Sequence, residues 1–149
     1  MINEIDKKYM LIALEESKGA NCIKGQVGAI IVKDNKILGK GNNSVPNGTK
    51  PCTEKTCIRR LLNLKSGERQ ELCKVVHAEQ NAILNALFNK EDLNSSTLYV
   101  TKSPCMICSK LIINAGIKRI VYANKYPDEE AFKILEEAKI ETCYLPLEL

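Results

Sequence analysis

The sequence predicts a three-layer α/β/α domain built on a five-stranded mixed sheet, and three observations support this fold class. Helical and strand-like apolar periodicities alternate along the chain, which is typical of α/β proteins with parallel neighbouring strands. Two short apolar runs flank a polar Asp-Asn turn at 34–35, which indicates an antiparallel hairpin and makes the sheet mixed. The length of 149 residues and the apolar content of 44% suit one domain, residues 1–149, with its own core.

The first half of the chain predicts a helix, a hairpin and a long irregular segment. Residues 2–17 place Ile5, Tyr9, Ile12 and Ala13 at helical spacing, and a glycine follows them. The hairpin occupies residues 26–41. From 42 to 73 the pattern dissolves into an irregular insertion, with a basic helical piece around 58–64. A loop this long is unusual in a compact domain, so we expect it to be functional or to be pinned by something.

The second half predicts helices alternating with strands, in the overall order α-β-β-α-β-α-β-α-β. Helices are expected at 77–89, 105–115 and 128–138, and strands at 97–101, 118–123 and 140–145. The apolar residues expected to face the core from the three helices are Ala82, Ile83, Ala86 and Leu87, then Leu111, Ile112 and Ala115, then Ala131, Ile134, Leu135 and Ala138.

Composition restricts the class of protein and its partners. No apolar run is long enough to span a bilayer, and the N-terminus lacks the features of a signal peptide, so we expect no membrane partner. A net charge of +4 without a basic block, and an aromatic content of 5%, argue against nucleic-acid binding. The chain has seven cysteines. An odd number without export signals predicts a reducing, cytoplasmic environment and favours metal binding over disulfides.

Two short motifs carry the candidate chemistry. The sequence CMIC at 105–108 is a C-x-x-C pair that could be redox-active, half of a structural zinc site, or without function. His77 is the only histidine, and it begins one predicted helix as Cys105 begins the next. If the strands before these helices are neighbours, His77, Cys105 and Cys108 converge at one edge of the sheet. Three ligands with a fourth position left for water are typical of catalytic zinc.

Glu79 is the candidate catalytic residue. It lies two positions after His77, and residues i and i+2 do not share a helix face, so Glu79 is not expected to be a fourth ligand. A carboxylate beside a zinc-activated water can take up and return a proton. A lone histidine is more often structural, but H-x-E combined with P-C-x-x-C favours a catalytic zinc site.

Long stretches of the chain resemble deoxycytidylate (dCMP) deaminases, within the zinc-dependent cytidine deaminase superfamily. The resemblance runs from Cys22 to Glu141 through VVHAEQNAIL, LYVTKSPCMICSKLIINAGIKRIVY and KYPDEEAFKILEEAKIE. It implies a cytidine-deaminase-like fold, zinc on the three ligands, and hydrolysis of dCMP to dUMP and ammonia for thymidylate synthesis. It also implies that Glu79 carries protons from water to ring N3 and to the leaving amine.

The resemblance assigns substrate contacts to Asn43, Ala78, Ser103 and Tyr126. Without it, Asn43 would be interpreted as a turn residue. The sequence departs from the family pattern around the second strand, where Gly-Asn-Asn-Ser stands at 41–44 in place of Gly-Tyr-Asn-Gly. Asn47 replaces an expected arginine, and Gly-Ala-Asn stands at 19–21 in place of Arg-Ser-Thr. Lys24 and Lys102 are candidate replacements as phosphate partners, and ordinary surface charge is the alternative.

Four further cysteines are a candidate second metal site, because family members can carry a second zinc in this region. They are Cys22, Cys52, Cys57 and Cys73, and four thiolates would close a structural zinc that pins the insertion. Buried free thiols are the alternative, and Cys143 is expected in the core.

The resemblance also implies a homo-oligomer, commonly a hexamer, activated by dCTP and inhibited by dTTP. A deaminase of another small amine-bearing base, nucleoside or nucleotide remains open because of the altered loop at 42–47. A non-catalytic zinc protein and a nucleic-acid-editing domain are weaker alternatives. The presence of Glu79 argues against a non-catalytic zinc protein, and the lack of a basic groove argues against a nucleic-acid-editing domain.

Overall fold

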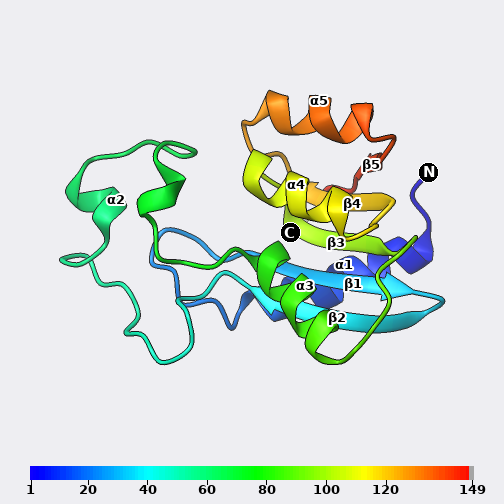
Figure 1. Ribbon diagram of the computed structural model, residues 1–149, viewed down its shortest axis with the longest axis horizontal. Coiled ribbons are helices and arrows are strands. Elements are labelled where there is room, and N and C mark those ends of the chain that lie inside the picture. The colour runs from blue at the N-terminus through cyan, green and yellow to red at the C-terminus, as the bar shows by residue number, and fades with distance from the viewer. Residues whose placement is uncertain (148–149) are drawn as a thin grey trace.

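The computed structural model describes residues 1–147 and has the predicted three layers (Figure 1). The elements are α1 (Glu4–Ser17), β1 (Gly28–Lys33), β2 (Lys36–Asn42), α2 (Ile58–Leu61), a 3-10 turn (Gln70–Leu72), α3 (Ala78–Phe88), β3 (Thr97–Lys102), α4 (Met106–Asn114), β4 (Arg119–Asn124), α5 (Glu129–Glu137) and β5 (Glu141–Tyr144). This order matches the predicted one, with the short α2 and the 3-10 turn added within the insertion, and the three-layer α/β/α fold with a mixed sheet is confirmed. No helix among residues 1–147 has the length and apolarity needed to cross a membrane.

The sheet has five strands in the order β2-β1-β3-β4-β5. The β1–β2 hairpin turns at Asp34 and Asn35, which both have positive φ, as a tight hairpin turn requires. β3 runs antiparallel to β1, whereas β3, β4 and β5 are parallel to one another. β1 lies inside the sheet, and its GAIIV run is buried throughout, which explains the uninterrupted apolar sequence.

The two faces of the sheet are covered by different helices. α1 packs on one face through Tyr9, Met10 and Ala13, against β1, β3 and β4. α3, α4 and α5 cover the other face, where the larger core contains Ile112 and Leu135. This second face positions the candidate site, because α3 and α4 begin there.

Glycines on β2 allow α3 to pack unusually close to the strand. A Cβ on Gly41 would lie 2.3 Å from the Ala82 nitrogen and 2.5 Å from the Ala78 carbonyl oxygen. Both contacts are to helix backbone, which cannot rotate away. The absence of a side chain at position 41 therefore sets the height of α3 above the sheet.

Three predicted apolar faces are partly wrong. Ile5, Leu87 and Leu111 were expected to face the core, but 51%, 55% and 44% of their surface is exposed. In α1 the inward position next to Ile5 is taken by Asp6, which is buried and paired with Arg119. Apolar spacing cannot reveal an inward carboxylate, because its partner lies more than a hundred residues away in the chain.

The insertion forms a lobe beyond the end of the sheet, with α2 at its far side (Figure 1). It leaves and returns at one point, where Ser44 and Val76 exchange two backbone hydrogen bonds of 3.1 and 2.8 Å. The next residue is His77. The chain is thus brought back beside β2 before α3 starts, whatever the path of the insertion between these two residues.

Candidate active site and metal centre

His77 and Cys105 each occupy the residue just before a helix, where the backbone is still extended. The His77 backbone N–H donates to the Gln80 side chain at 2.8 Å, which fixes the start of α3. At α4, the Met106 N–H donates to Asp128 at 2.9 Å, and the same carboxylate accepts from Ala131 at 3.0 Å. Asp128 therefore ties the start of the cysteine helix to the start of α5.

The route by which the two helix starts meet differs from the predicted one. The prediction depended on adjacent strands before α3 and α4, but β1 lies between β2 and β3. The helices meet because α3 lies across both β2 and β1, while α4 follows β3, the neighbour of β1, and contacts α3. The convergence was predicted, and the adjacency of the strands was wrong.

The three predicted metal ligands form a compact group. The His77 Nδ1 lies 3.2 Å from the Cys108 sulfur and 3.6 Å from the Cys105 sulfur. All three ligand atoms lie within 4.8 Å of one another, and no other such group occurs among residues 1–147. In tetrahedral zinc coordination, a nitrogen and a sulfur ligand are about 3.5 Å apart. The two observed nitrogen–sulfur distances are close to this value, so the group suits a zinc ion.

The electrostatics of the cluster favour a thiolate at Cys105. The hydrogen bond with Cys108 lowers the pKa of the Cys105 thiol, and the same contact raises the pKa of Cys108. The hydrogen bond with Cys105 raises the pKa of His77. Both sulfurs are buried, so a bound cation would compensate the negative charge of a thiolate in this site.

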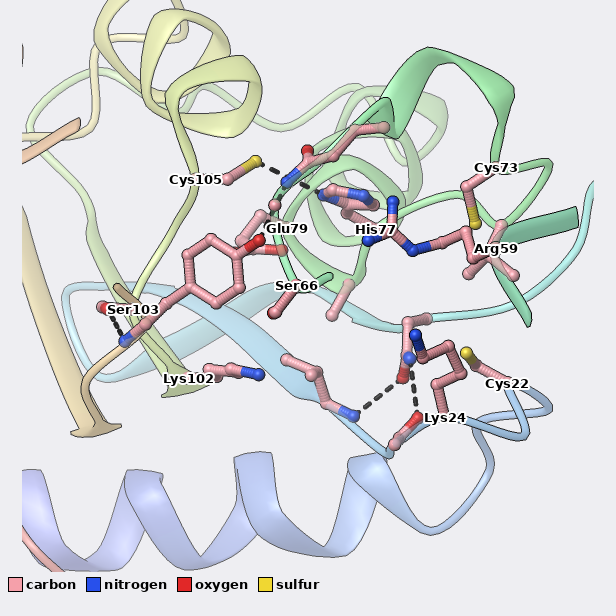
Figure 2. A pocket seen from close by; sticks show the side chains of 18 residues that line it. Cys22, Lys24, Arg59, Ser66, Cys73, His77, Glu79, Lys102, Ser103 and Cys105 are labelled. Atoms are coloured by element: carbon pink, nitrogen blue, oxygen red, sulfur yellow. Dashed lines mark hydrogen bonds between the residues drawn. The ribbon is translucent and has the colours of Figure 1, made fainter. Parts of the chain in front are cut away.

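Glu79 is buried in the first turn of α3 and is not a member of the ligand group. Burial raises the pKa of its carboxyl to about 7. Figure 2 shows Glu79 in the same cavity as His77 and Cys105, and all three line that cavity. A carboxyl that can hold or release a proton near neutral pH is what a proton carrier requires.

The structure brings the four predicted substrate contacts to the walls of this cavity, which is lined by Asn43, Ala78, Ser103 and Tyr126 among others. Asn43 accepts from the Val27 N–H at 2.7 Å and donates to the Gly25 carbonyl at 2.8 Å, so it also holds the loop before β1. Ser103 accepts from the Tyr126 N–H at 2.6 Å, which holds the tyrosine backbone beside the cavity that this residue lines.

Arg59 and Gln70 are lining residues from the insertion that were not predicted, as are Ser66 and Gly67. The guanidinium of Arg59 is buried and donates to the carbonyls of Glu68 and Lys65. Gln70 donates to the Tyr126 hydroxyl at 3.0 Å, while its own side-chain oxygen is buried without a partner among the described residues. Arg59 lies in the basic helical piece expected around 58–64, although nothing in the sequence indicated that it would line the cavity, and Gln70 lies in a part of the insertion without periodicity.

The four other cysteines lie at the same end of the molecule but do not form a closed site. Cys22 and Cys73 line the cavity, and Cys57 is buried. The pKa of Cys52 is raised, first by burial and further by the nearby Cys57, Cys73 and Cys22 thiols. Cys143, expected in the core, is only partly buried and donates to Glu141 at 3.2 Å.

An α/β/α fold with one imidazole and two thiols at two helix starts, and a buried carboxyl in the same cavity, defines a zinc-dependent hydrolytic deaminase of nucleobases. Comparison with known proteins identifies the family. Residues 3–124 match the family described as the cytidine and deoxycytidylate deaminase zinc-binding region. The chain belongs to this family.

Individual relatives agree with this assignment. The chain is 40% identical over 122 residues to the deoxycytidylate deaminase of Mycobacterium phage D29, covering 78% of this chain and 92% of the relative. It is 34% identical over 146 residues to that of Schizosaccharomyces pombe, covering 96% of this chain but spanning 45% of the yeast protein. The dCMP deaminase of cyanophage S-TIM5, solved with dCMP and dUMP, superposes with a TM-score of 0.81 at 33% identity, covering 97% and 99% of the two chains.

Proposed function

We propose that this chain hydrolyses dCMP to dUMP and ammonia, with zinc on His77, Cys105 and Cys108 and with Glu79 as the proton carrier. The observation that carries the proposal is the buried Glu79 carboxyl beside a three-ligand group in one cavity. The S-TIM5 relative, whose structure holds both dCMP and dUMP, supports the choice of substrate. The product would supply thymidylate synthesis.

Zinc, when bound, lowers the pKa of a water so that it can attack a ring carbon at neutral pH. The residues of the chain then divide the remaining work. Glu79 accepts a proton from the attacking water, delivers it to N3, and transfers the second proton to the amine that leaves C4. C4 gains an oxygen and loses ammonia, so the ring becomes uracil. Asn43, Ala78, Ser103 and Tyr126 hold the nucleotide against this carboxyl.

The test is ammonia release by the purified zinc-loaded protein from dCMP, CMP, dCTP, deoxycytidine, cytosine and adenosine, with and without added dCTP. The proposal expects dCMP to be turned over well above the others. A different preferred substrate would mean that the altered loop at 42–47 has changed specificity. One observation keeps that alternative open. Asn42, at the start of that loop, donates to the Glu16 side chain at 3.2 Å and not into the cavity. Release from no substrate by zinc-loaded protein would favour a non-catalytic role.

A homo-oligomer is part of the proposal, with a hexamer as the expected size. Exposed apolar side chains on two touching helices support it, namely Leu84, Leu87 and Phe88 on α3, and Ile107 and Leu111 on α4. Their spacing places each set on one helix face, and such patches are typical of interfaces. Light scattering should report an oligomer that Phe88→Lys dissociates. Activation by dCTP and inhibition by dTTP would show as changes in the rate of dCMP turnover.

We also propose a second, structural zinc on Cys22, Cys52, Cys57 and Cys73. The proximity of the other three thiols to Cys52 supports it, and closing the site requires a further approach of the sulfurs. Metal analysis should give about two zinc ions per chain, and Cys52→Ser should reduce this to about one. One zinc ion in both proteins would leave these cysteines as free thiols. A cytoplasmic location remains a prediction from cysteine content.

A further inference from the structure

The side-chain amide of Gln70 has a hydrogen-bond partner on one side only. Its Nε2 donates to the Tyr126 hydroxyl at 3.0 Å, whereas its Oε1 is buried and accepts from no residue among 1–147. A buried carbonyl without a donor is unfavourable, because it has lost its hydrogen bonds to water. Ser109 carries the other buried side-chain oxygen without a partner in this part of the chain, but Ser109 does not line the cavity and Gln70 does. A donor on a ligand in the cavity would satisfy the Gln70 oxygen.

Tyr126 holds this amide in its orientation. The Tyr126 backbone N–H donates to Ser103 at 2.6 Å, so the tyrosine is fixed at its backbone. Gly67 packs against the hydroxyl from the insertion, where an added Cβ would lie 2.9 Å from the hydroxyl oxygen. Because Nε2 is bonded to this hydroxyl, the carbonyl end of the planar Gln70 amide points away from it. The Oε1 is therefore positioned before a ligand binds, which limits the freedom that the side chain loses on binding.

Few other side chains that line the cavity offer a free acceptor. Three of them carry only donors, namely Lys24, Arg59 and Lys102. The Asn43 amide is already bonded at both ends, to the Val27 N–H and to the Gly25 carbonyl. Glu79 takes up and releases protons in the proposed reaction, so it is not a constant acceptor. Gln70 is therefore the described lining residue whose buried, uncharged acceptor is used neither by the fold nor by the proposed reaction.

Gln70 is connected to the end of the cavity where the candidate metal ligands lie. The insertion that carries it also brings Arg59 beside His77 (Figure 2), and the Arg59 charge acts on that imidazole. The tyrosine to which Gln70 is bonded is joined through Ser103 to the segment that leads into Cys105. A ring carbon that reacts at this site must approach the same end of the cavity, and its amino group comes with it.

We infer that Gln70 is a specificity-determining residue whose Oε1 accepts a hydrogen bond from the amino group of the substrate. This inference rests on the proposed function and adds a residue to it. The amino group at C4 is a donor, whereas the oxygen that replaces it is an acceptor, so the product offers this carbonyl no donor at C4. The cavity therefore binds the amine-bearing nucleotide more tightly than its product.

The test is calorimetric binding of dCMP and of dUMP to zinc-loaded Glu79→Gln, which binds both without turnover, with and without Gln70→Met. Methionine is close to glutamine in size and has no carbonyl. We expect Gln70→Met to weaken dCMP binding by about tenfold and to leave dUMP binding within about twofold. The matched control is Gln26→Met, which makes the same change at an exposed glutamine outside the lining residues and should alter neither value. An unchanged ratio of dCMP to dUMP affinity in Gln70→Met would overturn the inference.

Two further titrations separate this role from others that Gln70 could have. Tyr126→Phe removes the hydroxyl that the amide contacts and keeps the Gln70 carbonyl. It should therefore preserve the ratio of dCMP to dUMP affinity, and a ratio that falls as far as in Gln70→Met would mean that Gln70 acts only through the tyrosine. The second ligand is 2′,3′-dideoxycytidine monophosphate, which keeps the amine and lacks the 3′-hydroxyl. Gln70→Met should weaken it as much as dCMP, and no effect would assign the carbonyl to the sugar and overturn the inference.

The outcome for the inference is distinguishable from the outcome for the proposed reaction. If the wild-type protein does not deaminate dCMP, the same titrations are made on it directly. A preference for dCMP over dUMP that Gln70→Met removes would then support the inference while the proposed reaction fails. Deamination of dCMP together with an unchanged affinity ratio in Gln70→Met would overturn the inference and leave the proposed reaction in place.

Discussion

Replacement of Asp6 by asparagine tests how α1 is fixed to the sheet. The Asp6 carboxylate accepts from Arg119 at 2.7 and 3.0 Å, from the Tyr99 hydroxyl at 2.8 Å and from the Asn3 N–H at 3.0 Å. Every oxygen faces donors only. An amide in the same place must direct its NH₂ at one pair of these donors, and it leaves Arg119 with only the half-exposed Glu141 carboxylate, 3.5 Å from its Nε, as a counter-ion.

The expected loss follows from the burial of the pair. Asp6 is 1% exposed, and the side chain of Arg119 is 19% exposed. Removing one partner of a buried ion pair costs about 3–5 kcal/mol, and the partial exposure of Arg119 favours the lower end, about 3 kcal/mol. For a chain of this length, that corresponds to a Tm lower by about 6–12 °C. Calorimetric melting of the zinc-loaded protein measures it.

The pH dependence has a definite sign. Burial by itself raises the pKa of Asp6, but the hydrogen bonds from Arg119, Tyr99 and Asn3 outweigh it. The pKa of Asp6 in the folded protein is therefore lowered below its ordinary value of 3.8. A lowered folded-state pKa means that the stabilisation is complete above 3.8 and is lost as pH falls through the folded value. The difference in stability between wild type and Asp6→Asn should therefore stay constant from pH 7 to about 4.5 and become smaller below pH 3.8.

The matched control is Glu4→Gln. Glu4 pairs with Lys7 on the exposed face of the same first turn, so its loss should leave Tm almost unchanged. The reasoning would be refuted if Asp6→Asn lowered the Tm no more than Glu4→Gln does. It would also be refuted if the difference in Tm between wild type and Asp6→Asn disappeared near pH 6.

Two further predictions concern the elements that position the proposed zinc ligands. Gly41→Ala should lower the free energy of unfolding by about 1–3 kcal/mol or more, and with it the Tm, because the added Cβ would lie 2.3 Å from the α3 backbone. Gly25→Ala is the control, since nothing lies within 4 Å of its Cβ, and it should leave the Tm unchanged. Equal melting temperatures for the two variants would contradict this. Cys105→Ser should reduce bound zinc by about one ion per chain and abolish turnover, because a serine hydroxyl is a far weaker zinc ligand than a thiolate. Metal analysis of Cys105→Ser beside Cys143→Ser measures this, and unchanged zinc content would remove Cys105 from the site.

The sequence was sufficient for the fold class and for the grouping of the three candidate metal ligands. Both depend on local patterns, namely alternating periodicities and two short motifs at helix starts. His77 and Cys105 each stand immediately before a helix in the structure, so the local prediction placed them correctly although the strand order differed. Because α3 spans both β2 and β1, its start lies near the start of α4 even though β2 and β3 are not adjacent.

Features that depend on long-range contacts could not be predicted. Asp6 has the same local pattern as a surface carboxylate in a first helical turn, and only Arg119 and Tyr99 make its burial favourable. Leu87 and Leu111 fit a helical apolar pattern, yet both are exposed, because spacing alone does not distinguish a face that packs on the sheet from an exposed apolar face. Arg59 is held at the cavity by hydrogen bonds to the backbone carbonyls of Lys65 and Glu68, and the sequence does not reveal these contacts.

The central claim is that Glu79 moves protons at a site whose metal it does not bind. Replacement by glutamine keeps the size of the side chain and removes its ability to take up a proton. The decisive measurement is ammonia release from dCMP by Glu79→Gln, with zinc content determined on the same sample. The account predicts wild-type zinc content and a kcat lower by at least about a hundredfold. Near-normal turnover would contradict the role of Glu79, and loss of zinc would make it a ligand.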